Sequence, residues 1–441
     1  MTSYDDPIDA DRFGPLADIP ESSLLHLGSR IASNVLKLSN SEPKLLHRLG
    51  GPFNIVHILS FNNDTTRFII RVPATGWGKG LTPAADKALE AQVSALKFIK
   101  SQKDAKIPVP EVYDWDSTCN NEINAPYICL SYLPGKQVLR VWTDDNGPMP
   151  KEHMRLRILT SLTNVMAEFA KLPSFDRLGS LFLDDNGNVT IGPVYRREED
   201  PDGPVTIHEC GIYTSGQEYL RTMMERDSQD NHWGQAESKI TSTLISLLPK
   251  PDSEDFVLAP PDFDSANILV NPDTGEVTGL IEWDLTHTKP RWLGYSAYPY
   301  FLTRDWDPLM YGWPNISSED SPEALAAYRA HYSSELGRAL GRQGDWVFTD
   351  KSHLTMAVWI STLNPANRLE ICQKFLTEAW EGKVDALSVV WEIGKEKYGE
   401  EEWEVLKKKL RTFLAEGSKR HPGKSEGKGY EEKDKDKNEE K

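Results

Sequence analysis

The stretch VLAPPDFDSANILVNPDTGEVTGLIEWD, Val257 to Asp284, decides the fold because it joins a polar loop to a predicted β-hairpin. Two strand-like runs, residues 266–270 and 276–283, flank the turn sequence NPDTG. Asn, Pro, Asp and Gly between two apolar runs are typical of a hairpin connection. We therefore predict two antiparallel strands that follow an acidic loop.

The register of this hairpin brings polar side chains from its two ends together. If Val270 lies opposite Glu276, antiparallel counting places Glu282 opposite about position 264. Carboxylate and amide oxygens are suited to a hard cation such as magnesium. The oxygen donors that we expect at this end of the hairpin are Asp262, Asp264, Asn267, Glu282 and Asp284.

This set of side chains matches what phosphoryl transfer requires. Such a site needs a carboxylate near the acceptor hydroxyl, an amide or carboxylate on the metal, and a second carboxylate between the metal and the phosphates. Asp262, Asn267 and Glu282 supply these groups in that order. A solvated acidic turn is the alternative interpretation of the same pattern.

The region upstream predicts a hairpin, a helix and a further strand. Residues 53–61 and 66–72 alternate or are β-branched, residues 84–100 have helical spacing, and an extended stretch ends in YICLSYLPG. The Gly50-Gly51 pair before the hairpin allows either a close approach to a ligand or a tight bend. Arg71 has the strand parity of a residue that points inward, although an exposed strand position is the alternative.

The motifs PDFDSANILV, GLIEWD and PRWLGYSAYPYFLTRDWDP, with NEINAPYICLSYLPG upstream, resemble the aminoglycoside phosphotransferase and choline kinase-like family, especially its fungal branch. The similarity covers roughly residues 45–307. It implies an α+β, bilobal, protein-kinase-like fold with a small β-rich N-lobe and a larger α-helical C-lobe. It also implies ATP between the lobes and Mg²⁺ at the catalytic loop.

The resemblance assigns roles to particular residues. Asp262 matches the catalytic Asp, Asn267 the metal-binding Asn, and Glu282 the metal-binding Asp after the second hairpin. Arg71 falls where the family places a phosphate-pairing Lys or Arg, and residues 131–133 fall on the hinge that binds adenine. The nucleotide contacts that we expect are therefore Arg71, Gly50, Gly51, Ser131, Tyr132 and Leu133.

Three positions depart from the family pattern. Pro260 and Pro261 stand where the family often has His followed by Gly or Pro, so the catalytic loop can be oriented differently. Glu282 has one methylene more than Asp, and Asp284 can share or take over the metal. Gln92 replaces the helix Glu that pairs with the strand cation, which predicts a weaker, singly charged hydrogen bond to Arg71.

Two functions are compatible with this combination. The first is an ATP-dependent phosphotransferase that moves the γ-phosphate to a hydroxyl of a small molecule, with Asp262 orienting or deprotonating the acceptor. The second is a catalytically impaired kinase-fold protein that binds nucleotide or serves as an interaction module. The departures at Gln92, Pro260 and Glu282 favour the second function, and the presence of both Asp262 and Asn267 favours the first.

Composition limits the partners. The chain has 441 residues, and 50 Lys and Arg against 67 Asp and Glu give a net charge of −17. This acidic balance argues against nonspecific nucleic-acid binding and against binding to anionic membrane surfaces, which both require clustered cations.

The four cysteines are too few for a disulfide framework and lack the spacing of a zinc site. We expect a cytoplasmic protein without a membrane span, and the sequence leaves the oligomeric state open.

The domain organisation follows from the motifs. We predict an N-terminal extension at 1–45, a nucleotide-binding N-lobe at 46–135 and a C-lobe at 136–416 that holds the catalytic loop and the acceptor site. Residues 417–441 are rich in Lys, Asp, Glu and Gly. With almost no apolar side chains, this segment cannot offset the entropy of ordering, and we predict a disordered charged tail.

Overall fold

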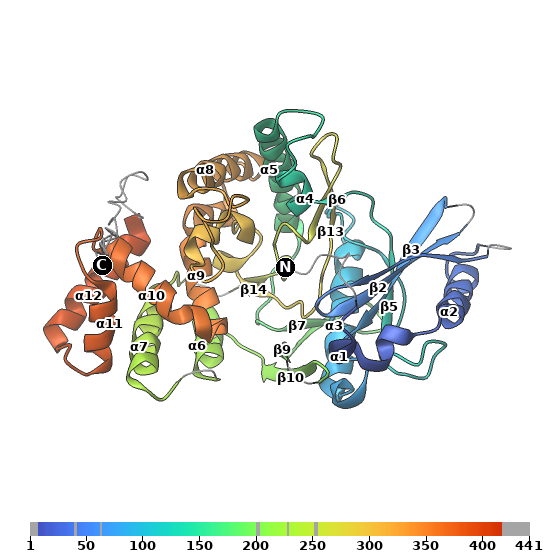
Figure 1. The fold of residues 1–441 in the computed structure, drawn as a ribbon, viewed down its shortest axis with the longest axis horizontal. Coiled ribbons are helices and arrows are strands. Elements are labelled where there is room, and N and C mark those ends of the chain that lie inside the picture. Colours follow the sequence, from blue (N-terminus) through green and yellow to red (C-terminus); the bar gives the residue numbers. More distant parts are fainter. Residues whose placement is uncertain are drawn as a thin grey trace, which may run out of the picture.

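The computed structural model describes residues 8–38, 42–61, 64–199, 203–226, 229–250 and 255–416. The chain forms a β-rich part at one end and a helix-rich part at the other (Figure 1), so the predicted bilobal α+β class is confirmed. The predicted tail at 417–441 lies outside the described residues. None of the described helices is long and apolar enough to cross a membrane.

The N-lobe is a five-stranded antiparallel sheet with the strand order β1-β2-β3-β5-β4. The predicted hairpin is β2 and β3, and the predicted helix 84–100 is α3, one residue longer at each end. Strand β1 was not predicted from the sequence. The bounds are β1 Lys44–Gly50, β2 Asn54–Phe61, β3 Thr66–Pro73, α3 Pro83–Ser101, β4 Val112–Asp116 and β5 Tyr127–Ser131.

Alternation along β3 gives the sheet two different faces. Phe68, Ile70 and Val72 are fully buried against the N-terminal helices α1 (Ala10–Phe13) and α2 (Glu21–Asn34). Ile69 and Arg71 point to the opposite face, which looks toward the helical part. Period-two alternation thus sends an apolar set to one core and a mixed set to the cleft between the lobes, and the inward prediction for Arg71 is confirmed.

Five short strands and three helices of the C-lobe surround the segment that carries Asp262 and Asn267. Strands β12 and β13 form the predicted hairpin, and β12 also pairs with β6, just after the hinge. Helix α5 packs against α8 and also contacts β13 of this hairpin. The bounds are β6 Lys136–Gln137, α4 Val138–Trp142, α5 Lys151–Glu168, β11 Phe256–Val257, β12 Ile268–Val270, β13 Val277–Leu280, β14 Lys289–Pro290 and α8 Pro322–Ala339.

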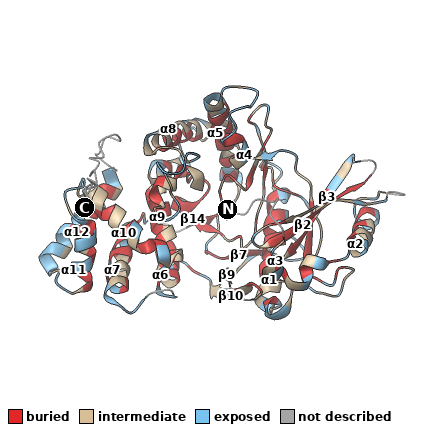
Figure 2. Ribbon diagram, viewed as in Figure 1, coloured by how far each residue is buried: buried red, intermediate tan, exposed pale blue. Residues whose placement is uncertain are grey.

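The remaining elements are two separate two-stranded sheets, β7-β8 and β10-β9, and the other helices of the helix-rich half. The predicted final helix is α12, where Leu406, Leu410 and Phe413 are buried and the outer residues are exposed (Figure 2). The bounds are β7 Ser180–Leu183, β8 Val189–Gly192, β9 Val194–Glu198, β10 Thr206–Gly211, α6 Gly216–Arg226, α7 His232–Leu247, α9 Ser352–Leu363, α10 Pro365–Ala379, α11 Ala386–Gly394 and α12 Glu400–Glu416.

The register of the catalytic hairpin differs from the prediction. Val270 pairs with Val277 rather than Glu276, and a register shift between Leu269 and Val270 adds a second residue of offset, so that Leu269 pairs with Gly279. The second strand also ends at Leu280, earlier than predicted. A bulge of this kind adds one residue to one strand only, so counting from the turn misplaces every residue beyond it.

One buried histidine in the N-lobe makes stability depend on pH. His57 in β2 is fully buried, and neither ring nitrogen has a hydrogen-bond partner. Burial, with a smaller contribution from Arg48, lowers the pKa of His57 to about 3. The unfolded chain therefore binds the proton more readily, and stability falls as pH drops below about 6.5.

We predict that His57→Leu removes part of this pH dependence. The wild type should lose about 2 kcal/mol more than the variant between pH 7 and pH 5, because only the wild type must keep a neutral imidazole buried. Urea denaturation at both pH values measures the difference, with His47→Leu on the exposed side of β1 as the control. An identical pH dependence in His57→Leu and wild type would contradict the prediction.

Candidate active site

The loop before β12 carries Asp262 and is held through its backbone carbonyls. The Nζ of Lys289, from β14, donates to the carbonyl oxygens of Pro260 at 2.8 Å and Pro261 at 3.1 Å. The hydroxyl of Tyr300 also donates to Pro261 O at 3.3 Å. Prolines have no backbone N–H, so this segment is fixed by what its carbonyls accept. Burial lowers the pKa of Lys289 to about 8, and Asp262 opposes that shift.

Asp262 and Asn267 form the centre of the loop. The Asn267 Nδ2 donates to Asp262 Oδ2 at 2.9 Å and to Asp262 O at 3.1 Å. This orientation turns the amide oxygen of Asn267 away from Asp262. Loss of hydration inside the cleft raises the pKa of Asp262, and the negative charge of the neighbouring Asp264 raises it further. The sequence prediction that Asp262 and Asn267 lie together is confirmed.

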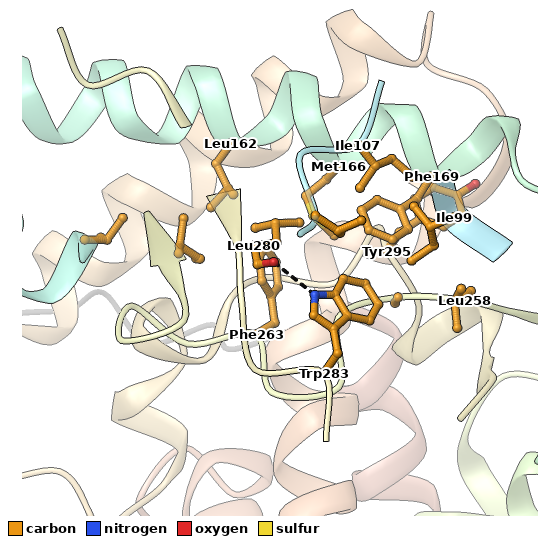
Figure 3. Close-up of a cluster of buried hydrophobic side chains, with 14 of the residues drawn as sticks. Ile99, Ile107, Leu162, Met166, Phe169, Leu258, Phe263, Leu280, Trp283 and Tyr295 are labelled. Atoms are coloured by element: carbon orange, nitrogen blue, oxygen red, sulfur yellow. Dashed lines mark hydrogen bonds between the residues drawn. The ribbon is translucent and has the colours of Figure 1, made fainter. Parts of the chain in front are cut away.

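Glu282 and Asp284 flank a buried tryptophan. Trp283 is 1% exposed, its ring stacks on Phe169 with centroids 6.3 Å apart, and its Nε1 donates to Leu280 O at 3.0 Å (Figure 3). The backbone of Glu282 has a φ of 60°, a conformation that is uncommon for a residue with a side chain. The indole anchors the segment in the core while both carboxylates line the cleft.

Arg71 pairs with both of these carboxylates. Its Nη2 lies 2.6 Å from Glu282 Oε2 and 3.2 Å from Asp284 Oδ1, and its side chain is 7% exposed. Asn54 Nδ2 donates to Asp284 Oδ2 at 2.7 Å. Burial raises the pKa of Asp284, but the charges of Arg71 and Arg197 outweigh it and the pKa is lowered. Arg71 of the N-lobe is thus paired with two carboxylates of the C-lobe. Gln92 lies in the same cleft.

Two adjoining cavities occupy the space between the lobes. The first, about 290 Å³, is mainly apolar and is lined by the predicted hinge residues 131–133 together with Arg71 and Gln92. The second, about 800 Å³, is lined by Gly51 and by the predicted catalytic and metal residues: Asp262, Asn267, Glu282 and Asp284. The structure therefore brings these predicted residues to one continuous cleft.

Gly50 and Gly51 differ in their surroundings. Gly51 lines the larger cavity. At Gly50, an added Cβ would lie 3.2 Å from Ile8 Cα, so the close approach there is to the N-terminal segment of the chain itself. The close approach at Gly50 is thus to the chain itself and not to the cleft, whereas Gly51 lines the space where a ligand can lie.

Sequence reasoning missed Arg197 and Lys289. Arg197 lies on β9, and its Nη2 is 3.4 Å from Asp284 Oδ2. Its guanidinium carbon lies 3.5 Å from the ring centroid of Phe53, in the loop between β1 and β2. None of the motifs quoted above includes either residue: Arg197 lies 87 residues before Asp284, and Lys289 stands just before the motif that begins at Pro290. Only the packing of the β9–β10 hairpin and of β14 places them there.

The oxygen donors of the larger cavity fit a magnesium ion that a nucleotide helps to bind. Among the described residues, no group of three His, Cys, Asp or Glu side chains is arranged to hold a metal alone. Magnesium typically takes one or two carboxylates and completes its shell with phosphates and water. Asn267, Glu282 and Asp284 line one cavity and supply ligands of this type.

The family of the chain follows from its sequence. The family model described as the phosphotransferase enzyme family, APH, matches residues 61–339, a range that holds β3, the catalytic loop and the second hairpin. The chain belongs to this family. The resemblance inferred from the motifs is therefore confirmed.

The individual proteins whose sequences match this chain are distant relatives. The altered inheritance of mitochondria protein 9 of Yarrowia lipolytica is 23% identical over 42% of this chain and 32% of its own length. A subtelomeric hrmA-associated cluster protein of Aspergillus fumigatus is 22% identical over 60% and 61%. The chain thus matches about a third and about three fifths of these two relatives.

Among solved structures, a Ralstonia eutropha protein described as a candidate aminoglycoside phosphotransferase is similar to this chain. The two share 14% identity, and the alignment covers 91% of this chain and 99% of the other. The TM-score is 0.47.

We predict that Asp284→Asn destabilises the protein by about 3 kcal/mol, because it leaves two poorly hydrated guanidinium groups with less negative charge to pair with. Chemical denaturation at pH 7 measures the loss. Asp273→Asn, in the exposed turn of the same part of the chain, is the matched control and should stay within about 0.5 kcal/mol of wild type. If Asp284→Asn lowers the free energy of unfolding by less than about 1 kcal/mol, the ion pairs of Asp284 with Arg71 and Arg197 do not stabilise the fold.

Proposed function

We propose that the protein is an ATP-dependent phosphotransferase that moves the γ-phosphate to a hydroxyl of a small molecule. The observation that carries this proposal is the Asp262–Asn267 pair, with Nδ2 and Oδ2 2.9 Å apart, in the same cleft as the Arg71 ion pair. These are a carboxylate for the acceptor, an amide for the metal and a cation for the phosphates. Membership of the phosphotransferase enzyme family supports the reaction class.

The two cavities suggest how the substrates would be arranged. The smaller, apolar cavity beside Ser131, Tyr132 and Leu133 has the chemistry and position suited to the adenine ring. The larger cavity has room for the phosphates and for part of an acceptor beside Asp262. Holding donor and acceptor in line is the main contribution that a protein makes to this reaction.

Asp262 would orient the acceptor hydroxyl and accept its proton. The raised pKa of Asp262 makes this carboxylate a stronger base than an ordinary Asp. The bond from Asn267 fixes its rotamer, and Lys289 fixes the loop that carries it. Asn267, Glu282 and Asp284 would hold Mg²⁺, which when bound neutralises phosphate charge. Arg71 would exchange part of its carboxylate pairing for phosphate oxygens.

A second candidate is a nucleotide-binding protein with impaired catalysis. The observation that favours it is the contact of 2.6 Å between Arg71 and Glu282. Because Glu282 already neutralises Arg71, its carboxylate must be displaced before Arg71 can bind the phosphates of ATP. The two candidates share nucleotide binding and differ in turnover, so a kinetic assay separates them.

We further propose a small-molecule hydroxyl acceptor as the partner rather than nucleic acid, since the chain carries a net charge of −17. A cytoplasmic location remains part of the proposal. The name of the Yarrowia relative includes the word mitochondrial, so fractionation of the tagged protein is the direct measurement of its compartment.

We predict that Asp262→Asn lowers turnover by a factor of about 10³ or more while ATP affinity changes less than about threefold, because Asp262 acts on the acceptor. Transfer of labelled phosphate from ATP to a panel of hydroxylated metabolites measures the rate, with Asp273→Asn as the control. Unchanged transfer in Asp262→Asn would remove this residue from the mechanism. Wild-type binding of ATP without any transfer would favour the impaired-kinase candidate.

We predict that ATP binding depends on magnesium through Glu282. Calorimetric titration with ATP should show tighter binding with Mg²⁺ than with EDTA, and Glu282→Ala should remove most of that difference because a charged ligand is lost. Glu282→Asp, which restores the family residue, should keep the dependence. No magnesium-dependent binding by wild type at millimolar ATP would contradict both candidate functions.

A further inference from the structure

The β9–β10 hairpin brings a cation into the cleft that the family resemblance did not anticipate. The hairpin packs against helix α3, where Tyr195 and Ile207 bury themselves beside Ala88. Arg197, two residues after Tyr195, extends to the larger cavity. The apolar contact with α3 therefore fixes the strand from which the guanidinium reaches the cleft.

The position of Arg197 is defined by two contacts of different kinds. The guanidinium carbon lies 3.5 Å from the centroid of the Phe53 ring, a close cation–π arrangement. The Nη2 is 3.4 Å from Asp284 Oδ2, which is longer than a normal hydrogen bond to a carboxylate. Stacking on a ring holds the plane of a guanidinium while its N–H edge stays able to donate to an anion.

The charges that line the larger cavity create a need for this cation. Four carboxylates border it: Asp262, Asp264, Glu282 and Asp284. Arg71 is already paired with two of them. A triphosphate adds several negative charges to the same space, so positive charge beyond Arg71 favours its binding. Two further arginines, Arg140 and Arg197, line this cavity. Arg197 approaches from the side of Phe53, which follows Gly51 in the loop that borders the cavity.

We infer that Arg197 is a second phosphate-binding residue, which holds the terminal phosphates of the nucleotide from the side opposite the hairpin β12–β13. This inference rests on the proposed nucleotide-dependent function. Arg197 exchanges its long contact with Asp284 for charge-assisted bonds to phosphate oxygens, and Phe53 keeps the guanidinium in place. The inserted β9–β10 hairpin thereby completes the phosphate site.

Calorimetric titration of the full chain with ATP, ADP and adenosine, in the presence of Mg²⁺, tests the inference. Arg197→Gln should weaken ATP binding about tenfold or more, since a charge-assisted contact is lost, and should leave adenosine binding within about twofold. Arg196→Gln is the matched control, because the adjacent residue points to the other face of β9 and lies 3.4 Å from Glu198. This control should bind all three ligands like wild type.

Arg197→Lys keeps the charge and loses the planar fork, so ATP affinity should lie between those of wild type and Arg197→Gln. If Arg197→Gln does not fold, the lysine variant decides: a loss of about threefold or more for ATP alone supports the inference. Equal losses for ATP and adenosine, or no loss for ATP, overturn it and leave the proposed function standing. A wild type that binds none of the three ligands overturns both.

Discussion

The ion cluster of Arg71 with Glu282 and Asp284 is the interaction on which the rest of the site depends. A guanidinium that is 7% exposed has lost most of its hydration, and only nearby carboxylates make that burial tolerable. Because Arg71 belongs to the N-lobe sheet and both carboxylates follow the C-lobe hairpin, the cluster joins the two lobes. The amide of Asn54, also in the N-lobe sheet, donates a further hydrogen bond to the carboxylate of Asp284.

A second constraint acts on the loop that carries Asp262. Its two prolines cannot donate backbone hydrogen bonds, so other groups must hold this segment. Lys289 solves this by donating to both proline carbonyls from the neighbouring strand, and Trp283 anchors the opposite wall in the core. The departures from the family pattern at Pro260 and Glu282 are thus accompanied by contacts that stabilise the altered loop and the altered carboxylate.

Local patterns predicted the elements better than their exact pairing. The alternation in 66–72 gave both the strand and the inward direction of Arg71, because period-two alternation is a property of each strand by itself. The predicted register of the β12–β13 hairpin was wrong by one residue at Val270 and by two at Leu269, since the bulge between these residues depends on the partner strands on both sides. Strand β1 was not predicted because its polar residues interrupt the apolar pattern, and its burial comes from the N-terminal segment that packs on it.

The sequence by itself determined the family, the two-lobed α+β class and the identity of the oxygen-bearing residues, because these follow from short motifs with fixed spacing. Only the tertiary structure decided that Asp284 is an ion-pair partner of Arg71, that Lys289 holds the catalytic loop and that Arg197 enters the cleft. These contacts join segments that lie from about thirty to more than two hundred residues apart. Their formation depends on how separate elements pack, which no local pattern records.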